Sequence, residues 1–230
     1  MGEFVQVQGE DGAFDAYLSL PERGSGPAVL VLAEIYNVNQ WVKDVTDRYA
    51  AQGYVALAPD LFWRQEPGLQ MAYTPENQQK GRKLAAAMDT DLAVKDLDTC
   101  LSFLRERPGS NGKVGAVGFC LGGQLAYRLA AHSNPDACSV YYGTRLQEMT
   151  ALVRQIRCPT QLHFGEADHG IPVACAWEIE KLAADMPNVA VHVYKDAPHG
   201  FGRFGYPPYR EADAHLALKR TLELFGNALR

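Results

Sequence analysis

A short glycine-rich segment between a predicted strand and a predicted helix constrains the fold of this 230-residue chain more than any other feature. The segment Gly118–Gly123 has the sequence GFCLGG, and it follows the apolar run 113–117 and precedes the helical pattern 124–131. A strand, a sharp turn and a helix in this order are typical of a nucleophile elbow, whose central residue has a strained backbone and needs flanking glycines. We therefore predict that this turn presents the sulfur of Cys120 beside a helix N-terminus, where the thiolate is stabilised.

The rest of the chain alternates between strand and helix patterns. Apolar runs of strand length occur at residues 4–8, 14–20, 28–33, 55–58, 114–119, 137–142, 160–164 and 189–194. Helical patterns occur at residues 39–51, 75–87, 90–106, 121–132, 172–185 and 210–228. The middle runs are apolar on both faces, as buried parallel strands are. This alternation predicts a single α/β domain over residues 1–230, with three layers and a mostly parallel central sheet covered by helices on both faces. The first two runs have no helix between them, which predicts an antiparallel start.

Composition excludes several classes of function. The net charge of −5 provides no basic surface for nucleic acid or for an anionic membrane. No apolar run approaches the roughly 18 residues of a membrane span, and the first residues do not resemble a signal peptide. Five cysteines without a C-x-x-C pair indicate free thiols in a reducing compartment. We expect a cytoplasmic protein, a monomer or alternatively a dimer, without a nucleic-acid or membrane partner.

Two further segments supply partners for Cys120, and each follows a predicted strand. The first is the loop 165–172, which carries Asp168, and the second is the loop 197–203, which carries His199. Strand ends form the ligand crevice of an open α/β sheet, and the order nucleophile, acid, histidine is that of α/β-hydrolases. We predict that His199 takes the thiol proton and later activates water, while Asp168 orients its ring. A turn-capping aspartate and a loop histidine are the structural alternatives.

Glu34 is a second unusual residue, because the apolar run 28–33 leads directly into it. An acid at the end of a central strand is expected to face the same crevice as Cys120, although it could also be a solvated loop carboxylate. The backbone N–H of Ile35, together with that of Leu121, is predicted to form an oxyanion hole. The histidines and cysteines show no metal-ligand spacing, so we expect no metal site.

Taken together, these motifs resemble the dienelactone hydrolases over nearly the whole length of the chain. The matching segments are residues 33–39, 53–54, 58–61, 110–115, 118–123, 141–143, 165–168 and 199–201. The resemblance implies a single-domain α/β-hydrolase fold, no cofactor, and a triad of Cys120, His199 and Asp168. It also implies that Glu34 pairs with the resting thiol and takes its proton when substrate displaces the carboxylate.

The substrate class implied by the resemblance is an enol lactone that bears a carboxylate. Such a lactone is opened to an oxo-dicarboxylic acid during the degradation of aromatic or chloroaromatic compounds. Arg203 matches the family's carboxylate-binding arginine, and Tyr36 and Tyr142 lie in motifs expected to contact substrate. An enol ester suits a thiolate nucleophile because the departing enolate is stabilised by conjugation.

The sequence departs from the family pattern in the helix after Pro75. The family places a second substrate-binding arginine where Gln78 stands, and Arg82 lies one helical turn further along, on the same face. Arg82 is therefore a candidate substitute, with a solvated side chain as the alternative. An expected bulky aromatic is replaced by Ala85, which predicts a roomier pocket and a broader substrate range.

Two alternative functions fit the same sequence. One is a broader carboxylesterase or thioesterase of the same family. The other is a non-catalytic thiol redox sensor, since a reactive cysteine beside a helix N-terminus can serve that role. A sensor requires neither Asp168 nor His199, and both are present.

Overall fold

The computed structural model describes residues 2–230, and its eight strands closely follow the predicted apolar runs. The strands are β1 (Glu3–Gln8), β2 (Ala13–Ser19), β3 (Gly26–Leu32), β4 (Val55–Pro59), β5 (Ser110–Phe119), β6 (Ala137–Tyr141), β7 (Thr160–Gly165) and β8 (Val189–Tyr194). The helices are α1 (Gln40–Ala51), α2 (Pro75–Ala87), α3 (Thr90–Glu106), α4 (Leu121–His132), α5 (Val173–Leu182) and α6 (Glu211–Ala228). All six α-helices match the predicted helical patterns. Two short 3₁₀ segments, Leu146–Glu148 and Thr150–Gln155, were not predicted.

The chain forms two compact units, Met1–Ala116 and Val117–Arg230, with the boundary inside β5. In the first unit β1 and β2 pair antiparallel, β2 pairs antiparallel with β4, and β3 and β4 are parallel. The predicted antiparallel start is therefore confirmed. Nearly every residue of β3 and β4 is buried, because α1 and α3 pack against these strands.

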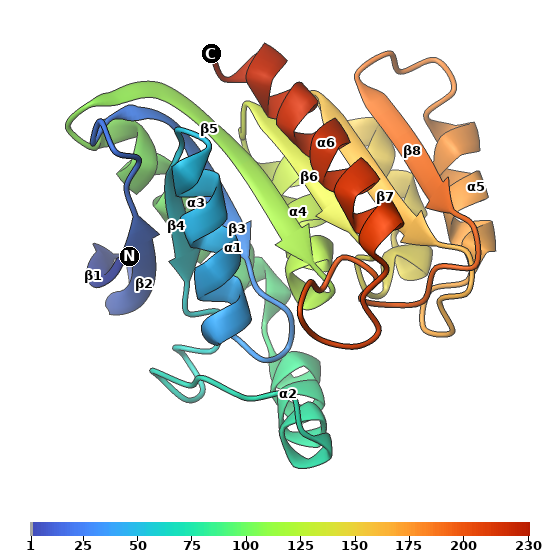
Figure 1. The fold of residues 1–230 in the computed structure, drawn as a ribbon, viewed down its shortest axis with the longest axis horizontal. Coiled ribbons are helices and arrows are strands. Elements are labelled where there is room, and N and C mark those ends of the chain that lie inside the picture. The colour runs from blue at the N-terminus through green and yellow to red at the C-terminus, as the bar shows by residue number, and fades with distance from the viewer. Residues whose placement is uncertain (1) are drawn as a thin grey trace. The chain divides into compact units, whose positions relative to one another are not determined.

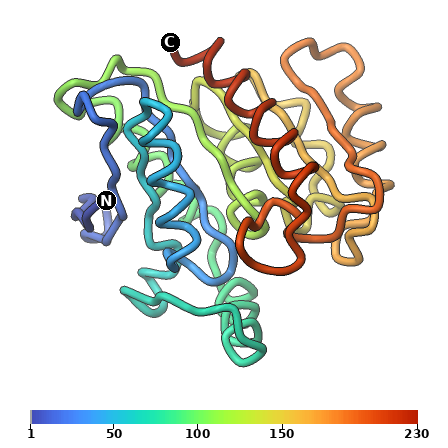
Figure 2. The backbone as a smooth tube through the Cα atoms, viewed as in Figure 1, coloured from blue at the N-terminus to red at the C-terminus, as the bar shows by residue number. Residues whose placement is uncertain are grey.

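In the second unit β6, β7 and β8 form a parallel series. Every residue of β6 is buried, so both faces of this strand are covered. Figure 1 shows α6 in front of these strands and α4 behind them, and Figure 2 shows the loop after β8 that leads into α6. The second unit thus has the three layers that the sequence predicted.

Side-chain caps start three of the helices at the residues where the sequence pattern begins. The Asn39 side chain accepts a hydrogen bond from the Val42 N–H (3.1 Å), and Thr74 accepts one from Asn77 (3.2 Å). Asp89 accepts two bonds at the start of α3. Such caps satisfy N–H groups that have no partner within the helix.

A buried cluster of three hydroxyl groups ties α6 to β6. The Thr221 hydroxyl lies 2.8 Å from that of Ser139 and 2.7 Å from that of Tyr141. Thr221 and Ser139 are fully buried and Tyr141 is nearly so. Because buried hydroxyl groups need partners, this cluster fixes where α6 sits on the strand.

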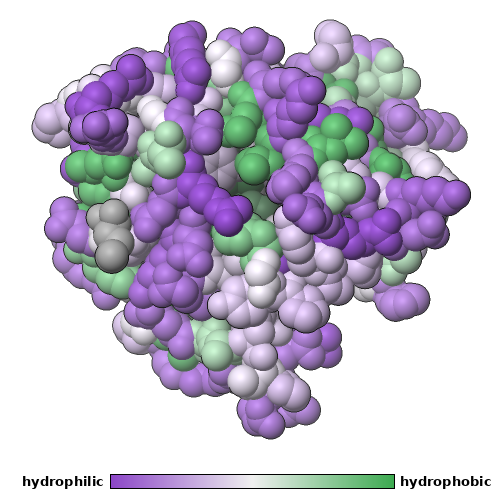
Figure 3. Space-filling view, in the orientation of Figure 1, coloured by the Kyte–Doolittle hydropathy of each residue, from purple (hydrophilic) through white to green (hydrophobic). Residues whose placement is uncertain are grey.

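The face of the molecule seen in Figure 3 is mostly hydrophilic, with apolar side chains visible between the polar ones. Among residues 2–230, no helix combines the length and the apolar character needed to cross a bilayer.

Candidate active site

The turn between β5 and α4 has the geometry of the predicted elbow. Cys120 adopts φ 57° and ψ −114°, a conformation that residues other than glycine rarely take. A Cβ added at Gly118 would collide with the carbonyl oxygen of Gly122, and one at Gly123 would lie 2.6 Å from the carbonyl oxygen of Tyr141. The turn therefore leaves no space for side chains at these two glycines.

Cys120 precedes the first turn of α4, and its backbone is held on both sides. Its N–H donates to the carbonyl of Tyr141 (3.1 Å), and its carbonyl accepts from Gln124 (3.0 Å) and Thr144 (3.1 Å). The residue is 6% exposed. Leu121 begins the helix, so its N–H is one of the first-turn donors that lack a partner within the helix.

The other four cysteines have a different environment. Burial raises the pKa of Cys100, Cys138, Cys158 and Cys175, the last to about 11. They are therefore neutral thiols near pH 7, as small buried packing groups are.

Asp168 and His199 form a direct pair at the ends of β7 and β8. The Nδ1 atom of His199 lies 2.7 Å from Oδ2 of Asp168. The other carboxylate oxygen accepts hydrogen bonds from the N–H groups of Gly170 (2.8 Å) and Ile171 (3.2 Å). The carboxylate is buried and both its oxygens are engaged, so it holds the imidazole in one orientation.

His199 also forms a side-chain hydrogen bond with Cys120, and this bond favours the protonated imidazole. Burial alone would lower the pKa of His199. The electrostatic interaction with Cys120 and the hydrogen bonds with Asp168 and Cys120 outweigh burial and raise the pKa of His199 to about 10. Since Nδ1 is bound to Asp168, Nε2 is the nitrogen available to the sulfur. The three predicted triad residues are thus brought together within the second unit.

The loops that carry Asp168 and His199 are packed closely against each other. A Cβ added at Gly165 would collide with the carbonyl oxygen of Ala197. That carbonyl accepts a hydrogen bond from Ala167 (3.0 Å), and the Glu166 side chain accepts one from the N–H of Asp196 (3.1 Å). These contacts limit how far the acid and the histidine can move apart.

Arg203 and Tyr142, both predicted to contact substrate, also lie near His199. The guanidinium of Arg203 packs against Gly200, where an added Cβ would lie 3.2 Å from Nη2, and it donates to the carbonyl of Pro207 (3.2 Å). The ring of Tyr142 lies 5.0 Å from that of His199, measured between centroids. Tyr142 is 0% exposed.

The remaining predicted site residues belong to the first unit. Glu34 is 1% exposed, and its Oε2 accepts a hydrogen bond from the Tyr73 hydroxyl (3.0 Å). The Tyr36 ring lies 4.5 Å from that of Tyr73. The carbonyl of Ile35 packs so closely on α2 that a Cβ at Gly81 would collide with it. Sequence reasoning missed Tyr73, because no motif links it to a carboxylate 39 residues away.

Helix α2 is largely exposed, and Gly81 is its one buried residue. Gln78 and Arg82 are exposed, while Lys80 pairs with Glu66 at 2.5 Å. The exposed position of Arg82 leaves its proposed substitution for an arginine at 78 as a prediction.

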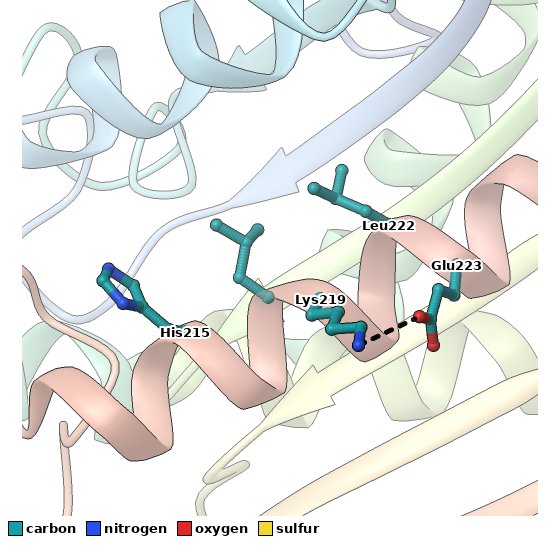
Figure 4. Close-up of a pocket in the computed structure, with 5 residues that line it drawn as sticks. His215, Lys219, Leu222 and Glu223 are labelled. Carbon is teal, nitrogen blue, oxygen red and sulfur yellow. Dashed lines mark ion pairs between the residues drawn. The ribbon is translucent and has the colours of Figure 1, made fainter.

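Other features of the second unit lie apart from the triad. A groove along α6 is lined by His215, Leu218, Lys219, Leu222 and Glu223, and Figure 4 shows the ion pair of Lys219 with Glu223 (3.9 Å). None of these residues is a predicted site residue. Across residues 2–230, no three or more His, Cys, Asp or Glu side chains are grouped so that they could hold a metal ion.

The model of the dienelactone hydrolase family matches residues 14–229. A carboxymethylenebutenolidase of Pseudomonas putida is 34% identical over 97% of this chain and 96% of its own length. Another, of Pseudomonas sp. (strain P51), is 35% identical over 93% of this chain and 90% of its own.

Solved structures confirm the predicted α/β-hydrolase class. A protein from Klebsiella pneumoniae subsp. pneumoniae MGH 78578 has a TM-score of 0.87 and 25% sequence identity, with 98% of each chain covered. The dienelactone hydrolase from Anabaena variabilis has a TM-score of 0.71 at 19% identity, over 100% of this chain and 99% of that one. With the family model matching almost its entire length, this chain belongs to the dienelactone hydrolase family.

Proposed function

We propose that this chain hydrolyses an enol lactone that bears a carboxylate to an oxo-dicarboxylic acid such as maleylacetate, in the degradation of aromatic or chloroaromatic compounds. The lactone is of the 4-carboxymethylenebut-2-en-4-olide type. Support comes from the carboxymethylenebutenolidases that are 34–35% identical to the chain. The observation that carries the proposal is the contact of His199 with Asp168 at 2.7 Å, together with its hydrogen bond to Cys120.

In the first step the Cys120 sulfur attacks the lactone carbonyl carbon. The carbon–sulfur bond forms as the ring C–O bond breaks, and the enolate leaves with the electron pair of that bond. The imidazolium of His199 supplies a proton to the leaving group, which becomes a ketone. Its raised pKa favours a proton-carrying ring at neutral pH, so acid and nucleophile are ready together. The Leu121 N–H is placed at a helix start, where developing negative charge on oxygen is stabilised.

In the second step water hydrolyses the thioester. Neutral His199 accepts a proton from the attacking water, the carbon–sulfur bond breaks, and the Cys120 thiolate regains its imidazolium partner. Asp168 keeps Nδ1 protonated throughout, so Nε2 remains the nitrogen that exchanges protons. Each turnover consumes one water molecule and produces one ketone and one carboxylate, and the new carboxyl group releases one proton to solvent.

The substrate carboxylate is assigned to Arg203. Its guanidinium lies over Gly200, next to His199, and a guanidinium can bind a carboxylate through two parallel hydrogen bonds. The roles that the family resemblance implies for Glu34, Ile35, Tyr36 and Arg82 stay predictions.

A turnover panel on one preparation tests the proposal. Initial rates are measured for cis- and trans-dienelactone, their methyl esters, an aryl acetate and an acyl thioester, with the wild type and Cys120→Ala. We expect selective hydrolysis of the carboxylated lactones and a loss on the order of 10⁴-fold or more in Cys120→Ala. Cys100→Ala, which changes a buried thiol of the first unit, is the matched control and should stay active.

The same panel separates the alternatives. Equal rates on lactones with a free and an esterified carboxylate would replace this proposal with a broader carboxylesterase or thioesterase. No turnover of any ester or lactone by the wild type, with Cys120 still reactive, would favour the redox sensor.

A further inference from the structure

Tyr142, directly after β6, has a strained backbone at a fully buried position. Its φ is 37° and its side chain is 0% exposed. A positive φ is unfavourable for a bulky residue, and such strain persists only where the surroundings determine the conformation strongly. The packing around Tyr142 in the second unit therefore fixes the direction of its side chain.

The backbone around Tyr142 is bonded to the nucleophile on both sides. The preceding carbonyl, of Tyr141, accepts from the N–H of Cys120 (3.1 Å), and the N–H of Thr144 donates to the carbonyl of Cys120 (3.1 Å). Tyr142 itself donates to the carbonyl of His163 (2.8 Å). These hydrogen bonds fix the segment 141–144 relative to the backbone of Cys120.

The side chain of Tyr142 reaches the base. Its ring meets that of His199 at 5.0 Å and an interplanar angle of 64°, and that of Phe201 at 5.4 Å and 70°. Its hydroxyl lies beside Gly202, where an added Cβ would make an ordinary contact of 3.4 Å with that oxygen. His199 is therefore held at Nδ1 by Asp168 and across its ring by Tyr142.

We propose that Tyr142 is a positioning residue that links the nucleophile to the base, holding the His199 ring at the place and angle from which Nε2 meets the Cys120 sulfur. This inference rests on the proposed function of the triad. It differs from the substrate contact expected from the sequence motif, because a fully buried side chain presents no surface to a substrate. Full burial and the ring contact with His199 both favour positioning.

Three variants test the role through kinetics. Tyr142→Phe keeps the ring, whereas Tyr142→Leu and Tyr142→Met remove it. Because misplacing a catalytic group by about 1 Å can cost about 10²-fold, we expect kcat on the carboxylated lactone to fall by about 10- to 100-fold in the Leu and Met variants. KM should stay within about threefold, and Tyr142→Phe should retain kcat within about threefold.

A second measurement needs no lactone. The rate of Cys120 alkylation by iodoacetamide is followed from pH 5 to 10, with the modified site identified by mass spectrometry. We expect the pH profiles of Tyr142→Leu and Tyr142→Met to move toward that of His199→Asn, and that of Tyr142→Phe to match the wild type. Phe225→Leu, which alters a fully buried ring on α6, controls for general destabilisation and should keep the wild-type profile.

The outcomes are distinct. Unchanged kcat and an unchanged alkylation profile in both ring-less variants would overturn the proposal. So would a rise in KM with normal kcat, which would return Tyr142 to substrate binding. If the wild type does not hydrolyse the lactone, the proposed function fails, while the alkylation profiles still decide whether Tyr142 positions His199. If Tyr142→Leu does not fold, Tyr142→Met, whose longer and more flexible side chain adapts better to the same space, supplies the comparison.

Discussion

Two histidines of the second unit, His199 and His163, are set among aromatic rings but differ in the groups that face them. The His199 side chain is 31% exposed and meets the Asp168 carboxylate at 2.7 Å. His163 is fully buried in β7, stacked on Tyr141 with ring centroids 4.5 Å apart. Its Nδ1 meets the hydroxyl of Tyr194 at 2.8 Å.

The pKa values of the two rings are shifted in opposite directions. Burial, with smaller contributions from His192 and Arg220, holds the pKa of His163 well below its usual value. Burial acts in the same direction on His199, but the interaction with Cys120 and the Asp168 hydrogen bond outweigh it. Although burial lowers the pKa of both rings, His199 becomes a proton carrier because Asp168 and Cys120 face it, whereas His163, which no carboxylate or thiol of residues 2–230 faces, is a neutral packing group.

The largest expected effect comes from removing the carboxylate. Asp168→Asn should lower kcat by about 10³- to 10⁴-fold, because the amide permits the wrong tautomer of the ring. It should also lower the pKa of His199, measured by NMR titration of its ring protons, and so make His199 more like His163. Asp185→Asn, at an exposed pair with Arg154, is the control. An unchanged pKa of His199 in Asp168→Asn would contradict the explanation of the contrast.

The free energy of unfolding should depend on pH through His199 on the alkaline side of the profile and through His192 on the acid side. The folded-state pKa of His199, about 10, lies above its ordinary value of 6.5. Its contribution to the free energy of unfolding is therefore present below pH 6.5 and lost as the pH rises toward 10. Burial, and then the Arg220 charge, lower the pKa of His192 to about 4, so its contribution is present above pH 6.5 and lost as the pH falls toward 4.

Urea unfolding midpoints measured from pH 4 to 10 test these two signs. His199→Asn should flatten the alkaline side of the profile and leave the acid side, and His192→Asn should do the reverse. If His199→Asn changed only the acid side, the assigned direction of its pKa shift would be wrong.

The smallest effect is expected at the partner of His163. Tyr194→Phe removes the hydroxyl that contacts His163 and accepts from Arg220 (3.1 Å). The free energy of unfolding should fall by about 1–3 kcal/mol, because a buried polar group loses its partner. The value of kcat should stay within about twofold of the wild type. A loss of kcat as large as that of Asp168→Asn would show that the two histidines are functionally coupled.

Much of the fold could be predicted because periodicity reports burial directly. The apolar run 28–33 predicted a strand buried on both faces, and β3 is such a strand. The segment 146–155 could not be predicted, because turns of 3₁₀ helix are too short to show a period. Strand β5 starts four residues before the predicted Val114, since its polar first half is exposed and lacks an apolar signal.

The site was predictable only where a motif names a residue. Cys120, Asp168 and His199 each lie in a recognisable turn, and the structure brings them together. The contact of Tyr73 with Glu34 and the burial of Tyr142 depend on packing between segments distant in sequence. The motif around Tyr142 marked the position but not the direction of its side chain.

The hydroxyl cluster that joins α6 to β6 has a consequence for the order of folding. Ser139 and Tyr141 rely on Thr221, which leaves the ribosome about 80 residues after them. Until then the two hydroxyl groups on β6 lack this partner. Burying them away from water without a hydrogen bond costs free energy. We therefore expect nascent chains that stop before α6 to expose this strand to chaperones, and the second unit to complete its packing only after synthesis has nearly ended.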